Sequence, residues 1–113
     1  SHYFFNKMAN SGILFQYAFD YADSHRKEIM RYGDAKKFNE KFVFTDAMFN
    51  ELMRRTEDKK IKGTEKDKAK GRELTEPLFK AYVARDVFGD EAFYQLYQPM
   101  DDILQKAIEE LTM

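Results

Sequence analysis

The side chains that could perform nucleophilic chemistry are few in this 113-residue sequence. It contains no cysteine, and its only serines are Ser1, Ser11 and Ser24. Catalysis of this kind needs a nucleophile, a base and an oxyanion hole. Ser11 fits a helix N-cap, and Ser24 and His25 are neighbours on a predicted helix, so we expect their side chains to diverge. We therefore predict no catalytic residue in this chain.

Metal and cofactor sites also lack a supporting pattern. A metal site usually takes three or four clustered ligands, whereas His2 and His25 are isolated. The acidic pairs Asp101-Asp102 and Glu109-Glu110 fit a helix start and the polar face of a helix. No glycine-rich phosphate loop has the required spacing. We predict neither a metal nor a cofactor.

One charged pair, Arg85-Asp86, stands inside the most apolar segment of the chain. A buried charge is costly unless it is paired or hydrogen-bonded. We therefore predict a structural ion pair at Arg85 and Asp86, or a bond to a helix C-terminus, in preference to a functional role.

Aromatic residues are abundant, with eleven phenylalanines and seven tyrosines. Aromatic side chains bury large areas, and they also anchor interfaces between proteins. Our candidate interface residues are Phe4, Phe5, Phe93, Tyr94 and Tyr97. The alternative is that all five fill the core of this domain.

The charge distribution argues against nucleic acid as a partner. The formal net charge is −1, and the basic stretch from Lys59 to Arg72 has no interleaved aromatic residues. A solvated hairpin between two helices explains that stretch. No run of 18 apolar residues is present, so we predict no membrane-spanning helix.

The sequence pattern predicts that all of the secondary-structure elements are helices. Apolar residues recur at steps of three and four, and no segment alternates as a half-buried strand does. We expect helices near residues 3–9, 11–33, 35–42, 45–62, 64–88, 90–98 and 101–111, the last with Ile103, Leu104, Ala107, Ile108 and Leu111 on one face. Thr45 and Thr64 are the strongest cap candidates. Pro77 should kink or split its helix, and Pro99 should end one. The prediction is an all-α, irregular bundle of about five to seven helices in a single domain.

Five phrases, in this order and spacing, resemble the C-terminal helical region of carboxyl-terminal processing (tail-specific) serine peptidases of Bacteroidetes-type bacteria. They are YFFNK at 3–7, NSGILFQYAFDYAD at 10–23, KAYVARD at 80–86, AFY at 92–94 and DILQKAIE at 102–109. The resemblance covers nearly the whole chain. The sequence departs from the family at Pro77, where an unbroken helix is expected.

The resemblance implies that residues 1–113 are a C-terminal helical accessory domain of a longer peptidase. The parent would carry a PDZ-like domain and a catalytic core with a Ser-Lys dyad, and would be exported to the periplasm or cell envelope. No catalytic residue transfers to this chain, whose opening Ser1-His2 we expect to be an artificial start or an internal cut. Its partners would be the catalytic and PDZ-like domains of the same polypeptide, unfolded or C-terminal protein substrates, or a second copy. Its task would be core packing, oligomerisation or substrate handling.

Two other functions stay open from the residues alone. A free-standing helical adaptor would bind a partner helix in an aromatic groove. A nucleic-acid binder would use Lys59 to Arg72 and would lose binding when Lys66, Lys68 and Lys70 are reversed in charge.

Overall fold

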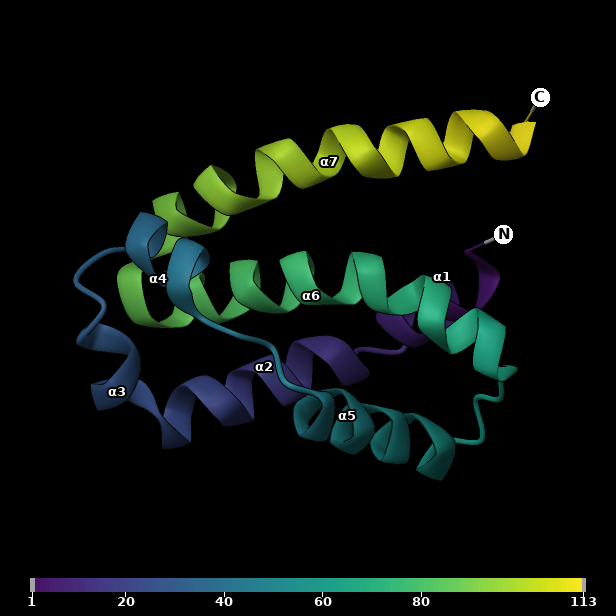
Figure 1. The fold of residues 1–113 in the computed structure, drawn as a ribbon, viewed down its shortest axis with the longest axis horizontal. Helices are drawn as coiled ribbons and strands as arrows, with labels where there is room; N and C mark the ends of the chain where they lie inside the picture. Colours follow the sequence, from purple (N-terminus) through teal and green to yellow (C-terminus); the bar gives the residue numbers. More distant parts are fainter. Residues whose placement is uncertain (1, 113) are drawn as a thin grey trace.

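The structure, a computed structural model, describes the backbone of residues 2–112 and the side chains of residues 2–99, 101 and 106. Within that part of the chain, every regular element is a helix (Figure 1). The helices are α1 (Tyr3–Asn10), α2 (Ile13–Ser24), α3 (Arg26–Met30), α4 (Ala35–Lys41), α5 (Asp46–Asp58), α6 (Glu65–Phe88) and α7 (Asp90–Thr112). The prediction of an all-α, irregular bundle is confirmed. The expected apolar face of the last helix lies outside the described side chains.

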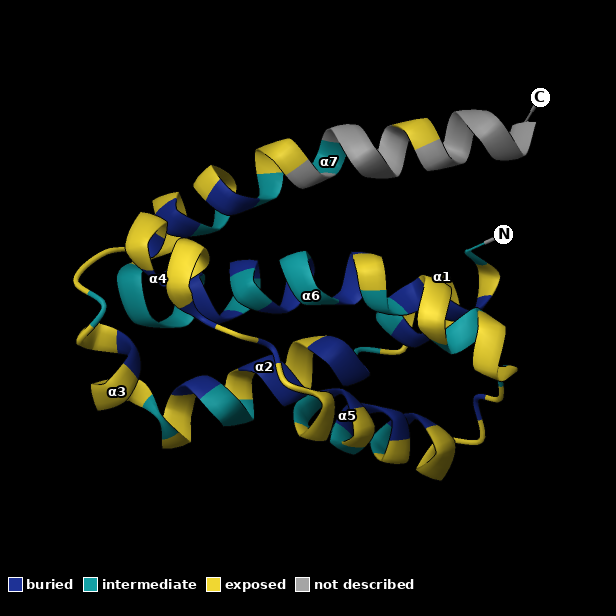
Figure 2. Cartoon of the chain, viewed as in Figure 1, coloured by how far each residue is buried: buried dark blue, intermediate teal, exposed yellow. Residues whose placement is uncertain are grey.

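Helix α6 is the axis of the domain. It contacts α1, α2, α3, α4 and α7, with α7 returning along one side and α2 lying on another (Figure 1). From Leu74 onward its buried side chains point to more than one neighbour, as the apolar residues all around this segment predict. Figure 2 shows buried and exposed residues alternating along α2 and α5, as on helices that are buried on one face.

The core is built largely from aromatic rings. Phe79 of α6 is fully buried, and its ring centroid lies 5.0 Å from that of Phe44 and 5.6 Å from those of Tyr17 and Tyr21. Phe38 of α4 is also fully buried. These rings join α2, α4 and the extended segment before α5 to the central helix.

Several predicted helix boundaries are wrong. The segment 11–33 is two helices, α2 and α3, because His25 leaves the helical region with φ −122° and ψ 21°. Ser11 is not the N-cap residue of α2: that place is held by Gly12, whose φ of 86° suits glycine. Pro99 does not end a helix, because α7 continues through it.

Pro77 likewise lies inside a continuous α6. A proline removes one intrahelical hydrogen bond. Here α2 and α7 pack against the same helix, and their contacts outweigh this loss.

The N-termini of α5 and α6 form as their residue types predict. The Thr45 hydroxyl accepts a hydrogen bond from the Met48 N–H at 3.2 Å. Thr64 forms a full capping box: its hydroxyl accepts from the Asp67 N–H at 3.1 Å, and the Asp67 carboxylate accepts from the Thr64 N–H at 3.0 Å. These local bonds start α6 at a charged, solvated end.

Replacing Thr64 by alanine is therefore expected to lower the free energy of unfolding by about 1 kcal/mol. The Thr64→Ser variant keeps the accepting hydroxyl and should stay within about 0.5 kcal/mol of the parent. Urea denaturation followed by circular dichroism measures both values. Equal losses in the two variants would show that the hydroxyl does not stabilise α6.

An ion-pair chain joins α2 to α5. The Arg55 guanidinium donates to the Asp20 carboxylate at 2.9 Å and to Glu51 at 3.2 Å, and it lies 4.8 Å from the Tyr17 ring centroid. Hydrogen bonds from Arg54 and Arg55 lower the pKa of Glu51 to about 2. The hydrogen bond from Arg55 is also the main cause that lowers the pKa of Asp20.

These lowered pKa values predict a dependence of stability on acid. A carboxyl whose folded pKa is depressed stabilises the fold above its unfolded pKa, and this stabilisation disappears as the pH falls through the folded value. For Glu51 the window runs from about pH 4.5 down to about pH 2. Urea denaturation between pH 5 and pH 2 should show a shallower loss of stability in Glu51→Gln than in the parent. The control Glu40→Gln, an exposed change on α4, should follow the parent.

Candidate functional site

The most distinctive surface of the domain is a group of aromatic rings around one arginine. It comprises Phe15 of α2, Tyr82 and Arg85 of α6, and Phe93 and Tyr97 of α7, and we name it the Arg85 cluster. Tyr82 and Arg85 are three residues apart, and Phe93 and Tyr97 are four apart, so each pair shares a helix face. Three helices therefore present their side chains to one place.

The rings form a continuous series. The Tyr82 ring centroid lies 5.2 Å from that of Phe15, in an edge-on arrangement, and 5.6 Å from that of Phe93, in a stacked one. Phe93 in turn stacks on Tyr97 at 5.0 Å. Edge-to-face and offset contacts of this kind stabilise beyond the area they bury. The series links α2, α6 and α7.

The Arg85 guanidinium lies among these rings. Its central carbon is 5.2 Å from the ring centroids of Phe15 and Phe93 and 5.6 Å from that of Tyr82. A cation over aromatic faces is attracted by their negative quadrupole, most strongly where water is partly excluded. Three rings therefore fix the position of one charge.

The predicted ion pair between Arg85 and Asp86 is absent from the ion pairs of the described residues. Adjacent residues on a helix point in different directions, so the Arg85 side chain reaches the rings and not its neighbour. The backbone carbonyl of Asp86 accepts a hydrogen bond from Arg26 of α3 at 3.1 Å. Arg85 and Asp86 are both half-buried.

Partial burial affects the titration of this region. Burial raises the pKa of Tyr82, and the nearby Arg85 charge opposes that change. Burial also raises the pKa of Asp86, against the opposing charges of Arg85 and Arg26. The guanidinium and its neighbours thus lie in an environment less polar than bulk water.

Exposed aromatic residues extend the Arg85 cluster to solvent. Phe15 is 42% exposed, and Phe19, one turn further along α2, is 47% exposed. Tyr94 of α7 is 59% exposed and meets Phe93 edge-on at 5.6 Å. Large exposed aromatic side chains grouped in this way are typical of protein-contact surfaces.

The five candidate interface residues divide between core and surface. Phe4 and Phe5 are buried in the domain's own core, where α1 packs on α6 beside Gly71. Phe93 and Tyr97 belong to the Arg85 cluster, and Tyr94 adjoins it. Sequence reasoning missed Phe15 and Tyr82, although Phe15 widens the apolar face of its helix and could have indicated a second contact surface.

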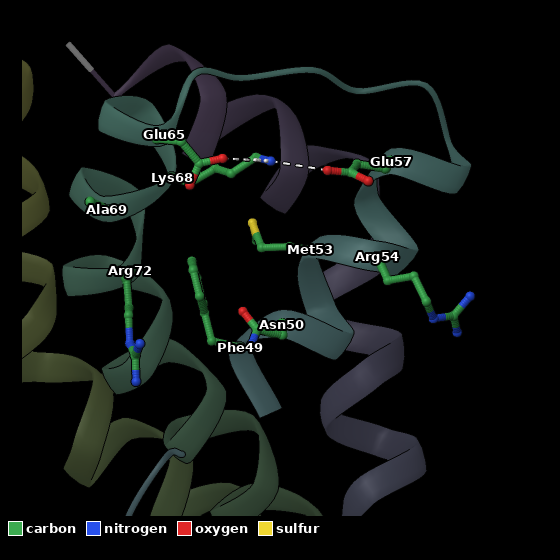
Figure 3. A pocket seen from close by; sticks show the side chains of 9 residues that line it. All are labelled: Phe49, Asn50, Met53, Arg54, Glu57, Glu65, Lys68, Ala69 and Arg72. Carbon is green, nitrogen blue, oxygen red and sulfur yellow. Dashed lines mark hydrogen bonds and ion pairs between the residues drawn. The ribbon is translucent and has the colours of Figure 1, made fainter. Parts of the chain in front are cut away.

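A groove of about 510 Å³ lies between α5 and the first half of α6 (Figure 3). Phe49 and Met53 of α5 line its apolar part. The Lys68 ammonium bridges the two helices, 3.0 Å from the Glu57 carboxylate and 3.7 Å from that of Glu65. The charges around this groove are therefore largely neutralised.

Arg72 closes a further side of the groove. Its guanidinium lies 5.0 Å from the Phe49 ring centroid and 2.7 Å from the Asp46 carboxylate. Lys68 and Arg72, two cations of the basic stretch, are thus engaged with carboxylates of the same chain.

The Ser24 and His25 side chains meet, contrary to the expectation that they diverge. Helix α2 ends at Ser24, and the Ser24 Oγ lies 2.9 Å from the His25 Nδ1. The same Nδ1 is 3.0 Å from the Tyr21 carbonyl, and the imidazole stacks on the Tyr21 ring at 4.0 Å. The pair is a helix-end contact: no acidic side chain is hydrogen-bonded to the His25 ring within the described residues, as a catalytic triad would require.

Metal ligands do not gather in the described part of the chain: no group of three or more His, Asp or Glu residues there could hold an ion. Among the helices described, none combines the length and apolar character needed to cross a bilayer.

Fold and site together define an all-α domain organised on one central helix, with a partly exposed group of aromatic rings around an arginine. The chain belongs to a family described as a family of unknown function, DUF8443, which it matches over residues 4–89. That range holds Phe15, Tyr82 and Arg85 but ends at Gly89, before Phe93. No curated protein and no solved structure matches the chain.

Proposed function

We propose that this chain is a non-catalytic helical domain of a carboxyl-terminal processing serine endopeptidase, and that it contacts protein through the Arg85 cluster. The exposed aromatic surface around Arg85 is the observation that carries the contact role. The peptidase parent is inferred from the resemblance of five ordered phrases, three of which supply Phe15, Tyr82, Arg85 and Phe93 to this surface.

The parent in this proposal cuts proteins with a Ser-Lys dyad and works in the periplasm or cell envelope. The domain contributes to core packing, oligomerisation or substrate handling. Its partners are the catalytic and PDZ-like domains of the same polypeptide, unfolded or C-terminal protein substrates, or a second copy of the chain. Rigid aromatic side chains suit these contacts because they lose little conformational entropy when they bind.

The reading frame upstream of residue 1 tests the parentage. We expect it to continue into a PDZ-like segment and a core with a Ser-Lys pair. A start codon directly before Tyr3 would overturn the proposal.

Variants of the parent enzyme test the contact role. The Phe15→Ser and Tyr94→Ser changes, made together, should lower the rate at which the full enzyme degrades an unfolded protein by about thirtyfold, since interface anchors contribute about 1 kcal/mol or more each. Tyr3→Ser is the matched control, because Tyr3 is 70% exposed on α1, outside the cluster. Equal rates in all three enzymes would exclude a role for this surface in substrate handling.

A free-standing helical adaptor is the alternative function. The groove between α5 and α6, with Phe49 and Met53 along it, is the observation that favours it, because partner helices dock in apolar grooves. It requires a complete gene that starts near Tyr3 and specific capture of a partner by the isolated chain.

A further inference from the structure

We propose that Arg85 is the docking point for an acidic side chain of a protein segment in which an aromatic residue lies next to the acid. This inference deepens the proposed contact role, because it names the chemistry of the segment that the Arg85 cluster accepts. It does not depend on the identity of the parent enzyme.

The Arg85 guanidinium has N–H groups that are available to donate hydrogen bonds to a ligand. An arginine carries five N–H donors in one plane. Within the described residues, no ion pair or hydrogen bond joins the Arg85 guanidinium to another side chain or carbonyl, whereas Arg54, Arg55 and Arg72 each contact a carboxylate. Arg85 is half-buried, so water still reaches it.

The surrounding rings determine from which direction a carboxylate can approach the Arg85 guanidinium. Phe15, Tyr82 and Phe93 surround the guanidinium at 5.2–5.6 Å and restrict its rotation. A carboxylate binds a guanidinium edge in its own plane, through two parallel hydrogen bonds. Because the rings hold Arg85 in place beforehand, less side-chain entropy is lost when a carboxylate binds.

The local charge favours an acid. Two guanidinium groups, those of Arg85 and Arg26, act on one nearby carboxylate, that of Asp86. Arg26 is already engaged with the Asp86 carbonyl. A carboxylate on Arg85 would supply the contact with a negative charge that no described residue supplies, in surroundings that are partly shielded from water.

The adjacent surface favours an aromatic neighbour. Phe15 and Phe19 lie one helical turn apart and are each nearly half exposed, and Tyr94 is exposed at the edge of Phe93. A ring placed beside the acid can stack on these side chains while the acid reaches Arg85. A simple anion has no such contact, so the geometry points to an acidic–aromatic protein segment.

Three N-acetylated dipeptides test this inference on the 113-residue chain by NMR titration. They are acetyl-Glu-Phe-amide, acetyl-Gln-Phe-amide and acetyl-Gln-Phe with a free carboxyl terminus. We expect acetyl-Glu-Phe-amide to bind about tenfold more tightly than acetyl-Gln-Phe-amide, with shifts at the Arg85 Nε–H and the Phe93 amide, since a charge-assisted bidentate contact is of that size. Equal binding of the first two peptides, or preference for the free carboxyl terminus, overturns the proposal.

Two variants separate docking from packing. Arg85→Gln should abolish the preference for the acidic peptide. Arg31→Gln, the same charge change at an exposed residue after α3, should keep it. If the preference survives in Arg85→Gln while the variant remains folded by circular dichroism, Arg85 is not the docking point. If Arg85→Gln unfolds, Arg85→Lys replaces it: lysine keeps the charge but lacks the planar fork, so an unchanged preference there overturns the bidentate contact.

The result of the peptide titration is independent of the result of the reading-frame test. A preference for the acidic peptide can hold in a free-standing adaptor, and its absence leaves the peptidase parentage intact.

Discussion

Replacing Phe79 by alanine should lower the free energy of unfolding by about 3–5 kcal/mol, the range for a fully buried phenylalanine. Phe79 has no exposed surface, and its ring meets those of Tyr17, Tyr21, Phe42 and Phe44. Alanine leaves a cavity between α2, the segment before α5 and α6. Domains of this size are stable by roughly 6–17 kcal/mol, so the loss is a large share of the total.

Urea denaturation of the parent, Phe79→Ala and Phe19→Ala measures this effect. Phe19 is 47% exposed, so its truncation should cost no more than about 1 kcal/mol. A similar cost for the two variants would contradict the placement of Phe79 at the centre of the core.

Replacing Gly63 by alanine is expected to lower the free energy of unfolding by about 1–3 kcal/mol, the range for overpacking. A Cβ atom at Gly63 would lie 2.5 Å from the Phe4 Cδ1 atom. Phe4 is buried against the same region and cannot move its ring away freely. The backbone of Gly63 does not require a left-handed conformation, so the side-chain contact is the cause.

Gly71→Ala is the matched control on α6. There a Cβ atom would lie 3.5 Å from the Phe5 Cβ, an ordinary contact. Alanine is also favoured over glycine inside a helix, so this variant should be more stable than the parent by about 0.5–1 kcal/mol. Melting curves of the two variants should therefore move in opposite directions.

A double variant identifies Phe4 as the source of the clash. Phe4→Leu removes part of the ring that faces Gly63, so Gly63→Ala should cost at least 0.5 kcal/mol less in that background than in the parent, the lower range of coupling between contacting residues. An unchanged cost would show that another group limits the space at Gly63.

Local interactions explain which features were predictable. The capping bonds of Thr45 and Thr64 each span three residues, so residue type and spacing suffice to locate the starts of α5 and α6. The recurrence of apolar residues at steps of three and four depends only on the helical period, and it predicts the helices themselves. The helix boundaries predicted at Ser11 and Pro99 were wrong, and the boundary at His25 was not predicted, because packing and local backbone geometry outweighed the residue preferences.

The Arg85 cluster could not be predicted in the same way. Arg85 in an apolar segment indicated that a partner was needed, and the sequence neighbour Asp86 was the simplest choice. Its actual contacts include Phe15, which is 70 residues earlier, and Phe93, which follows the turn at Gly89. Only the packing of α2 and α7 on α6 brings these rings to one place.

The sequence by itself therefore determined the helical class, the caps of α5 and α6, and the excess of aromatic residues. Tertiary structure alone decided which aromatic residues are core and which are surface. Phe4 and Phe93 are chemically identical, yet Phe4 is buried by α6 and the Gly63 turn, whereas Phe93 lies half-buried beside a charge. The physical reason is that burial depends on contacts between segments distant in sequence, while capping and helical periodicity depend on residues within one or two turns.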